Sequence, residues 1–138
     1  MSKSTATHAR PRARPLSPHL QVYRLIPTML MSIVHRITGA ALYFGTLLVM
    51  AWLVAAATSE VWFDRVTWLY GSWIGLLVLF GYTWALVHHL LGGIRHFVMD
   101  TGKGLEKHFS TRVAVAMPFV SVGLTILLWI VGFVARGA

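Results

Sequence analysis

Three long apolar stretches, separated by short polar ones, make up most of the sequence. They run from about residue 29 to 57, from about 66 to 98 and from about 113 to 135. About 20 apolar residues in a helix are enough to cross the hydrocarbon core of a bilayer, so each stretch is long enough to span it. If these stretches were instead buried helices of a soluble protein, too few polar residues would remain for a water-facing shell. The pattern therefore predicts an all-α membrane protein with three transmembrane helices.

Lysine and arginine are unevenly distributed among the polar segments. They are concentrated in residues 1–28 and in the break at residues 100–112. The first break contains only Arg65 and the carboxyl-terminal tail only Arg136, so the positive-inside rule places the amino terminus in the cytoplasm or the mitochondrial matrix. We expect a polar segment, residues 1–28, on this inner side, followed by a transmembrane domain of residues 29–138. The polar segment has no apolar core long enough for a signal peptide, so we expect it to be retained.

The composition excludes several classes of protein. Of the 138 residues, 57% are hydrophobic, which is too many for a disordered chain or an ordinary soluble domain. There is no cysteine, which rules out a disulfide framework and a thiolate metal site. The formal net charge of +8 is typical of some nucleic-acid-binding proteins, but the basic residues form no continuous face. We therefore expect contacts with membrane lipid and none with nucleic acid.

Titratable residues cluster toward the inner ends of the first two predicted helices, where each calls for a partner or a function. In the second helix, His89 and His96 are seven residues apart, and Gly92 and Gly93 lie between them on the same stripe. Neutral imidazole is a common axial ligand of haem iron, and the glycines leave room for a flat ligand beside it. The alternative, which the spacing leaves open, is that the glycines permit close helix packing and the histidines bond across helices. His88 points about 100° around the helix from His89, so the two should not bind one metal.

A second polar group lies near the start of the first predicted helix. Ser32 and Arg36 are four residues apart on one helix face, with His35 beside them. A hydroxyl and a guanidinium can donate together to a carbonyl oxygen, as the head group of a quinone requires near the edge of the bilayer. The alternative is that the Arg36 side chain only extends to lipid phosphates.

Longer motifs run through these residues. Residues 14–20 read RPLSPHL and are followed by SIVHRITG at residues 32–39, and residues 89–102 read HLLGGIRHFVMDTG. In this combination the chain resembles the family of cytochrome b556 subunits, the small membrane anchors of succinate dehydrogenase (respiratory Complex II). The resemblance extends from about residue 14 through the third apolar stretch, which matches only in length and apolarity. The family often has tryptophan at the position of Met99.

The resemblance implies a role for each group of polar residues. It implies that His89 is an axial ligand of a haem b shared with a second hydrophobic anchor subunit, which would supply the other histidine. It implies that Ser32 and Arg36 help to bind ubiquinone. The residues implied at the haem propionates are His35, Arg95 and His96, and Asp100 is implied at the subunit interface. We expect Lys103 and Lys107, in the basic second break, to belong to the same interface.

The resemblance also implies the activity of an assembled complex. Succinate would be oxidised to fumarate in a flavoprotein subunit that carries FAD, and electrons would pass through the clusters of an iron-sulfur subunit to ubiquinone. This chain would contribute no residue to succinate oxidation, and its basic inner segments, including Arg10, Arg12 and Arg14, would dock the iron-sulfur subunit. The implied location is the cytoplasmic (inner) membrane of a bacterium or the inner membrane of a mitochondrion. The competing interpretations are the anchor of a quinol:fumarate reductase and a membrane scaffold without redox activity.

Overall fold

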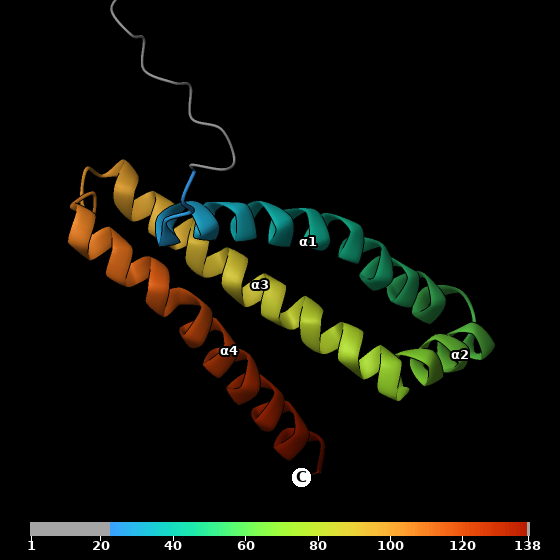
Figure 1. The fold of residues 1–138 in the computed structure, drawn as a ribbon. Helices are drawn as coiled ribbons and strands as arrows, with labels where there is room; N and C mark the ends of the chain where they lie inside the picture. Colours follow the sequence, from blue (N-terminus) through green and yellow to red (C-terminus); the bar gives the residue numbers. More distant parts are fainter. Residues whose placement is uncertain (1–22, 138) are drawn as a thin grey trace, which may run out of the picture.

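The computed structural model describes residues 23–137, which form four α-helices (Figure 1). These are α1 (Pro27–Thr58), α2 (Glu60–Gly71), α3 (Trp73–Asp100) and α4 (Lys107–Gly137). Helices α1, α3 and α4 contain 32, 28 and 31 residues, and each is long and apolar enough to cross a membrane. The prediction of an all-α chain with three such helices is therefore confirmed. Residues 1–22, which include Arg10, Arg12 and Arg14 of the predicted polar segment, lie outside the described residues.

The second predicted helix is divided into two helices in the structure. α2 begins at Glu60 rather than near residue 66, and it ends before Ser72, whose extended backbone separates it from α3. The Ser72 hydroxyl oxygen accepts a hydrogen bond from the backbone N–H of Gly75 at 3.1 Å and so caps the first turn of α3. Because the apolar pattern continues on both sides of Ser72, hydrophobicity alone does not reveal this break.

α4 also begins earlier than predicted, at Lys107 rather than near residue 113. Its first turns carry polar side chains. Ser110 in these turns is buried and accepts a hydrogen bond from Arg95 of α3, so the start of α4 packs against α3. The connection from α3 turns at Gly102 and Gly104, whose φ angles of +78° and +72° lie in the left-handed region that glycine adopts without strain. This reversal brings α4 back along α3.

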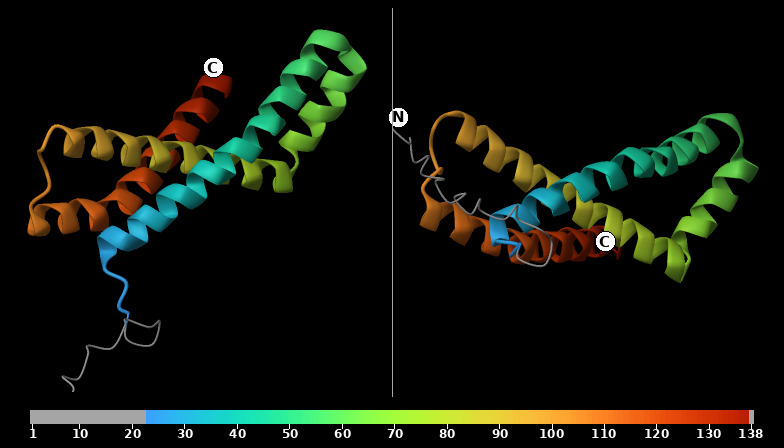
Figure 2. Two further views of the ribbon diagram at one scale, coloured as in Figure 1. Left: turned by 90° about the horizontal axis from the view of Figure 1, so that it is seen from above. Right: turned by 45° about the horizontal axis from the view of Figure 1, so that its top comes forward.

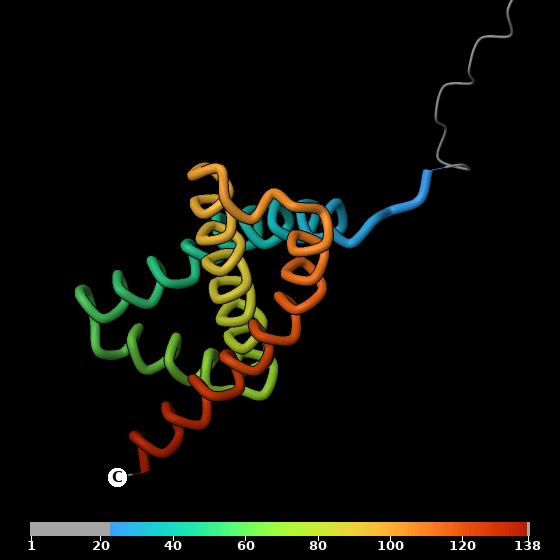
Figure 3. Tube along the Cα trace, turned by 90° about the vertical axis from the view of Figure 1, so that its left-hand side faces the viewer, coloured from blue at the N-terminus to red at the C-terminus, as the bar shows by residue number. Residues whose placement is uncertain are grey.

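α3 packs against both α1 and α4, and α1 also contacts α4 (Figure 2, Figure 3). The three helices meet at a small core of Met31, Ala114 and Met117, against which Val34, Leu91 and Val113 pack. Other contacts between helices are made by small polar side chains, since Thr38, Ser121 and Thr125 are each at most 2% exposed. In lipid, close approach of small residues and hydrogen bonds between helices provide the stability of such packing.

Large apolar side chains cover most of the outer surface of the helices. Tyr43 on α1 and Phe119 on α4, for example, are each 75% exposed. An apolar surface of this extent is typical of a membrane or subunit interface. We therefore expect lipid or neighbouring subunits to cover it.

Candidate functional site

Three histidines gather where α1 packs against α3. The imidazole of His35 on α1 stacks on that of His89 on α3, with 3.9 Å between the ring centroids and 4° between the ring planes. The ring of His96 lies 5.2 Å from that of His35. A Cβ atom on Gly92 would lie 2.9 Å from His35 Cε1, and one on Gly39 would lie 2.9 Å from His89 Cε1. Each of the two stacked imidazoles thus packs against a glycine of the opposite helix.

The hydrogen bonds of His89 determine which of its nitrogens can bind a metal. Its Nδ1 atom lies 3.1 Å from the backbone oxygen of His35 and 3.3 Å from the hydroxyl of Thr38. A carbonyl oxygen can only accept, and the Thr38 hydroxyl already donates within its own helix, 2.9 Å from the Val34 oxygen and 3.0 Å from the His35 oxygen. The geometry therefore places the proton on Nδ1 and leaves the Nε2 lone pair available. A histidine that donates Nδ1–H to a carbonyl and binds through Nε2 is a common arrangement at metal sites.

The glycine pair does not form the open notch that its spacing suggested. The His35 ring fills the space beside Gly92, and its Nδ1 atom is buried with no hydrogen-bond partner among the described residues. No atom lies within 4 Å of a Cβ atom added to Gly93. A flat ligand beside His89 therefore has room on the Gly93 side of the stripe, whereas His35 closes the Gly92 side.

Ser32 and Arg36 do not line a common cavity among residues 23–137. Ser32 is half-buried and lines a cavity of about 370 Å³ together with His96 and Lys107. Arg36 is exposed and does not line that cavity. A site that uses both side chains would therefore have to include a surface from outside residues 23–137.

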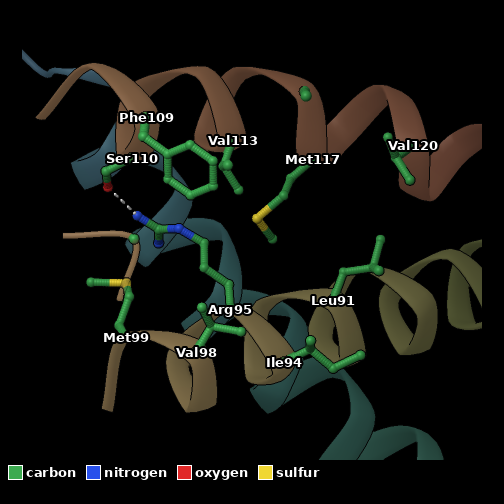
Figure 4. Close-up of a pocket in the computed structure, with 12 residues that line it drawn as sticks. Leu91, Ile94, Arg95, Val98, Met99, Phe109, Ser110, Val113, Met117 and Val120 are labelled. Atoms are coloured by element: carbon green, nitrogen blue, oxygen red, sulfur yellow. Dashed lines mark hydrogen bonds between the residues drawn. The ribbon is translucent and has the colours of Figure 1, made fainter. Parts of the chain in front are cut away.

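Arg95 faces away from the stacked histidines. Its guanidinium donates a hydrogen bond to the Ser110 hydroxyl of α4 at 2.8 Å (Figure 4). The structure thus does not bring Arg95 together with His89, although the sequence motif implied both at the same haem.

The residues predicted at the subunit interface are grouped at one end of the molecule. Asp100 ends α3, Lys103 lies in the connection and Lys107 begins α4, and all three side chains are exposed. The start of α1 lies at the same end, because Thr28 lines a cavity together with Lys107 (Figure 1). The predicted interface residues and Ser32 are therefore neighbours in space.

A second polar cluster, which the apolar pattern did not reveal, joins α3 to α4. His88 is fully buried, and its Nδ1 atom lies 3.1 Å from the hydroxyl oxygen of Ser121. That oxygen also accepts a hydrogen bond from Trp84 Nε1 at 3.2 Å, and the Trp84 ring stacks on His88. His88 and His89 therefore have different partners, as their spacing predicts. The sequence feature that could have indicated this cluster is the pair Ser121 and Thr125, two polar residues four positions apart in an otherwise apolar stretch.

Comparison with known proteins identifies relatives along most of the chain. Residues 10–131 match the family model of the succinate dehydrogenase/fumarate reductase transmembrane subunit. The succinate dehydrogenase cytochrome b556 subunit of Paracoccus denitrificans is 49% identical over 121 residues, which cover 88% of this chain and 93% of that protein. The cytochrome b556 subunit of Rickettsia felis is 32% identical over 117 residues, covering 85% of this chain and 91% of that protein. The mitochondrial cytochrome b560 subunit of Sus scrofa is 37% identical over 111 residues, covering 79% of this chain and 66% of that protein.

The chain therefore belongs to the family of transmembrane subunits of succinate dehydrogenases and fumarate reductases. Within that family it serves as a cytochrome b membrane-anchor subunit of succinate dehydrogenase, respiratory Complex II. It is thus a multi-pass membrane protein that works in a complex with other succinate dehydrogenase subunits. The resemblance stated from the two sequence motifs is confirmed.

Proposed function

We propose that this subunit binds haem b through His89 and that a second hydrophobic anchor subunit supplies the other axial ligand. Its relatives are named as b-type cytochromes. The observation that carries the assignment is the hydrogen bond from His89 Nδ1 to the His35 carbonyl, because it leaves Nε2 free to bind iron. Bound there, the haem would supply a one-electron acceptor and donor inside the membrane.

Other residues of this chain would orient the imidazole and hold the edge of the haem. The stacked ring of His35 and the carbonyl of the same residue restrict rotation of the His89 ring. His35 and His96 are proposed at the propionates, where a ring N–H can donate to a carboxylate. Because the His35 Nδ1 atom is buried against Gly92, the Nε2 atom of His35 would be the donor. Arg95 could bind a propionate only if its guanidinium gave up the hydrogen bond to the Ser110 hydroxyl on α4.

The haem assignment is tested by reduced-minus-oxidised absorption spectra of the purified complex. His89→Ala should remove the bands of haem b, whereas His108→Ala, which removes an exposed histidine outside the site, should leave them unchanged. Succinate oxidation by a soluble artificial acceptor, measured on the same samples, reports whether the complex has assembled. A normal haem spectrum in an assembled His89→Ala complex would show that another residue is the ligand.

We also propose that Ser32 and Arg36 take part in binding ubiquinone. The Ser32 side chain lines a cavity, and the Arg36 side chain is exposed one turn further along α1, so a neighbouring subunit would complete the pocket. In Ser32→Ala and Arg36→Leu, quinone reduction should fall while succinate oxidation by a soluble acceptor stays normal. Thr46→Ala, on an exposed part of α1 far from this end, is the control. Equal loss of both activities would indicate a role in assembly instead.

We propose that the end carrying Asp100, Lys103 and Lys107 faces the cytoplasm or matrix, together with residues 1–28, and docks the iron-sulfur subunit. The flavoprotein subunit would be held in the complex through that subunit. Exposed lysines in a short connection support this orientation by the positive-inside rule. A variant that combines Lys103→Glu and Lys107→Glu should reduce the amount of the soluble subunits that purifies with the membrane domain, whereas Arg136→Glu should not. Normal assembly of the double variant would contradict the docking surface.

A further inference from the structure

Two adjoining cavities lie where α3 and α4 run side by side near their connection. One has a volume of about 320 Å³ and a mainly apolar lining, which includes Leu91, Ile94, Val98, Val113, Met117 and Val120 (Figure 4). The other, of about 370 Å³, has a more polar lining that includes Ser32, His96, Lys107 and Thr111. Arg95, Met99 and Ser110 line both cavities, so the two meet at these residues.

Positive charge at this junction is not balanced by the surrounding side chains. The Arg95 guanidinium bonds to the neutral hydroxyl of Ser110, and neither lining contains a carboxylate from residues 23–137. Lys107 adds a second cation to the polar cavity. A cationic side chain on a membrane-spanning helix is costly unless it is paired, and an anion supplies the opposite charge. The polar cavity is therefore suited to an anionic group, and the apolar cavity beside it to a hydrocarbon chain.

We propose that the two cavities together bind one anionic phospholipid, with its phosphate at Arg95 and Lys107 and an acyl chain between α3 and α4. Basic pockets between transmembrane helices on the inner side of a membrane are typical sites for anionic lipid head groups. A quinone also has an apolar tail, but its uncharged head group would leave the Arg95 guanidinium without a counter-charge. Arg95 faces α4, whereas His89 faces α1, so the inference does not use the proposed haem ligand, although His96, which is proposed at the propionates, also lines the polar cavity. Ser32 lines the polar cavity, which makes the lipid a neighbour of the proposed quinone site.

The chemistry of the head group is tested on the delipidated wild-type complex in a neutral detergent. Binding and the unfolding temperature are measured with phosphatidylglycerol, with phosphatidylcholine of the same acyl chains, and with inorganic phosphate alone. We expect phosphatidylglycerol to bind and to raise the unfolding temperature, and the other two to do neither. Equal effects of the two lipids would exclude an anionic site, and an equal effect of phosphate alone would mean that the lipid chain is not recognised. Either result overturns the proposal.

The location of the lipid is tested with two variants and two matched controls. Arg95→Gln removes the charge at the junction, and Ala116→Phe fills the apolar cavity, which Ala116 lines. The controls Arg112→Gln and Val115→Phe introduce the same two side chains at exposed positions that line neither cavity. Loss of one cation should weaken phosphatidylglycerol binding about fivefold. Ala116→Phe should abolish binding, and both controls should bind as the wild type does.

Unchanged lipid binding in both variants would overturn the proposal. The proposal would also be overturned if the purified Ala116→Phe complex lost bound quinone but kept its phospholipid, because the apolar cavity would then hold a quinone tail. Loss of haem from Arg95→Gln with normal lipid binding would assign Arg95 to the haem and would likewise contradict the site. If Arg95→Gln prevents assembly, the Ala116→Phe variant and the comparison of head groups on the wild type still decide the question.

Discussion

The contact between Gly92 and His35 offers a sharp test of how the candidate site is packed. In Gly92→Ala, the new Cβ atom would lie 2.9 Å from His35 Cε1 and nearer still to Nδ1 of the same ring. Non-bonded carbon atoms rest about 3.5–4.0 Å apart, so the His35 ring would have to retreat by at least about 0.6 Å. That ring is also stacked on His89, with 3.9 Å between the centroids. It therefore cannot move without disturbing His89 or separating α1 from α3.

The expected change in stability has two parts of opposite sign. Overpacking a close contact costs about 1–3 kcal/mol, and replacing glycine by alanine inside a helix recovers about 1 kcal/mol. Gly92→Ala should therefore destabilise the subunit by up to about 2 kcal/mol. Gly81→Ala, on the same helix, is the matched control, because no atom lies within 4 Å of its added Cβ and only the gain in helix propensity applies.

The two glycine variants are compared in the purified complex by thermal unfolding and by the reduced-minus-oxidised haem spectrum. Gly92→Ala should unfold at a lower temperature than Gly81→Ala and should weaken or shift the haem bands, because the residue that it displaces also supplies the carbonyl for His89 Nδ1. Adding His35→Ala to Gly92→Ala should recover part of the lost stability, since the two side chains are in direct conflict. Equal behaviour of the two glycine variants would refute the packing described for the three histidines.

Two further predictions concern hydrogen bonds away from these histidines. Ser121→Ala removes the hydroxyl that bonds to both His88 and Trp84, so it should lower the free energy of unfolding of the complex by about 1–2 kcal/mol while the haem spectrum is retained. Ser121→Thr keeps the hydroxyl and is its control, and an unchanged unfolding midpoint in Ser121→Ala would argue against the cluster. Ser72→Ala removes the cap of α3 and should cost about 1 kcal/mol in thermal unfolding. Ser59→Ala should cost less, because the Ser59 side chain caps no helix, and equal costs would mean that the capping bond contributes nothing.

Much of this architecture can be predicted from the sequence because the features concerned are local. An apolar stretch of about 20 residues is a property of consecutive positions, so three helices of spanning length were predictable. The shared stripe of His89 and His96, and the different direction of His88, follow from the periodicity of a helix. The motifs around Ser32 and His89 were likewise sufficient to indicate the family. The start of α4 was harder to predict, because its first turns are polar and become helical by packing on α3.

The sequence alone does not determine which neighbour each side of a helix meets. His35 fills the space beside Gly92 and holds His89 through a hydrogen bond between residues 54 positions apart, and Arg95 bonds to Ser110 rather than to His35 or His89. These contacts were decided by the tertiary structure. The physical reason is that lipid tails are as apolar as the helices themselves. Hydropathy therefore predicts that a segment spans the membrane, but it does not predict which other helices that segment contacts. That choice depends on small and polar side chains fitting together along the whole length of three helices.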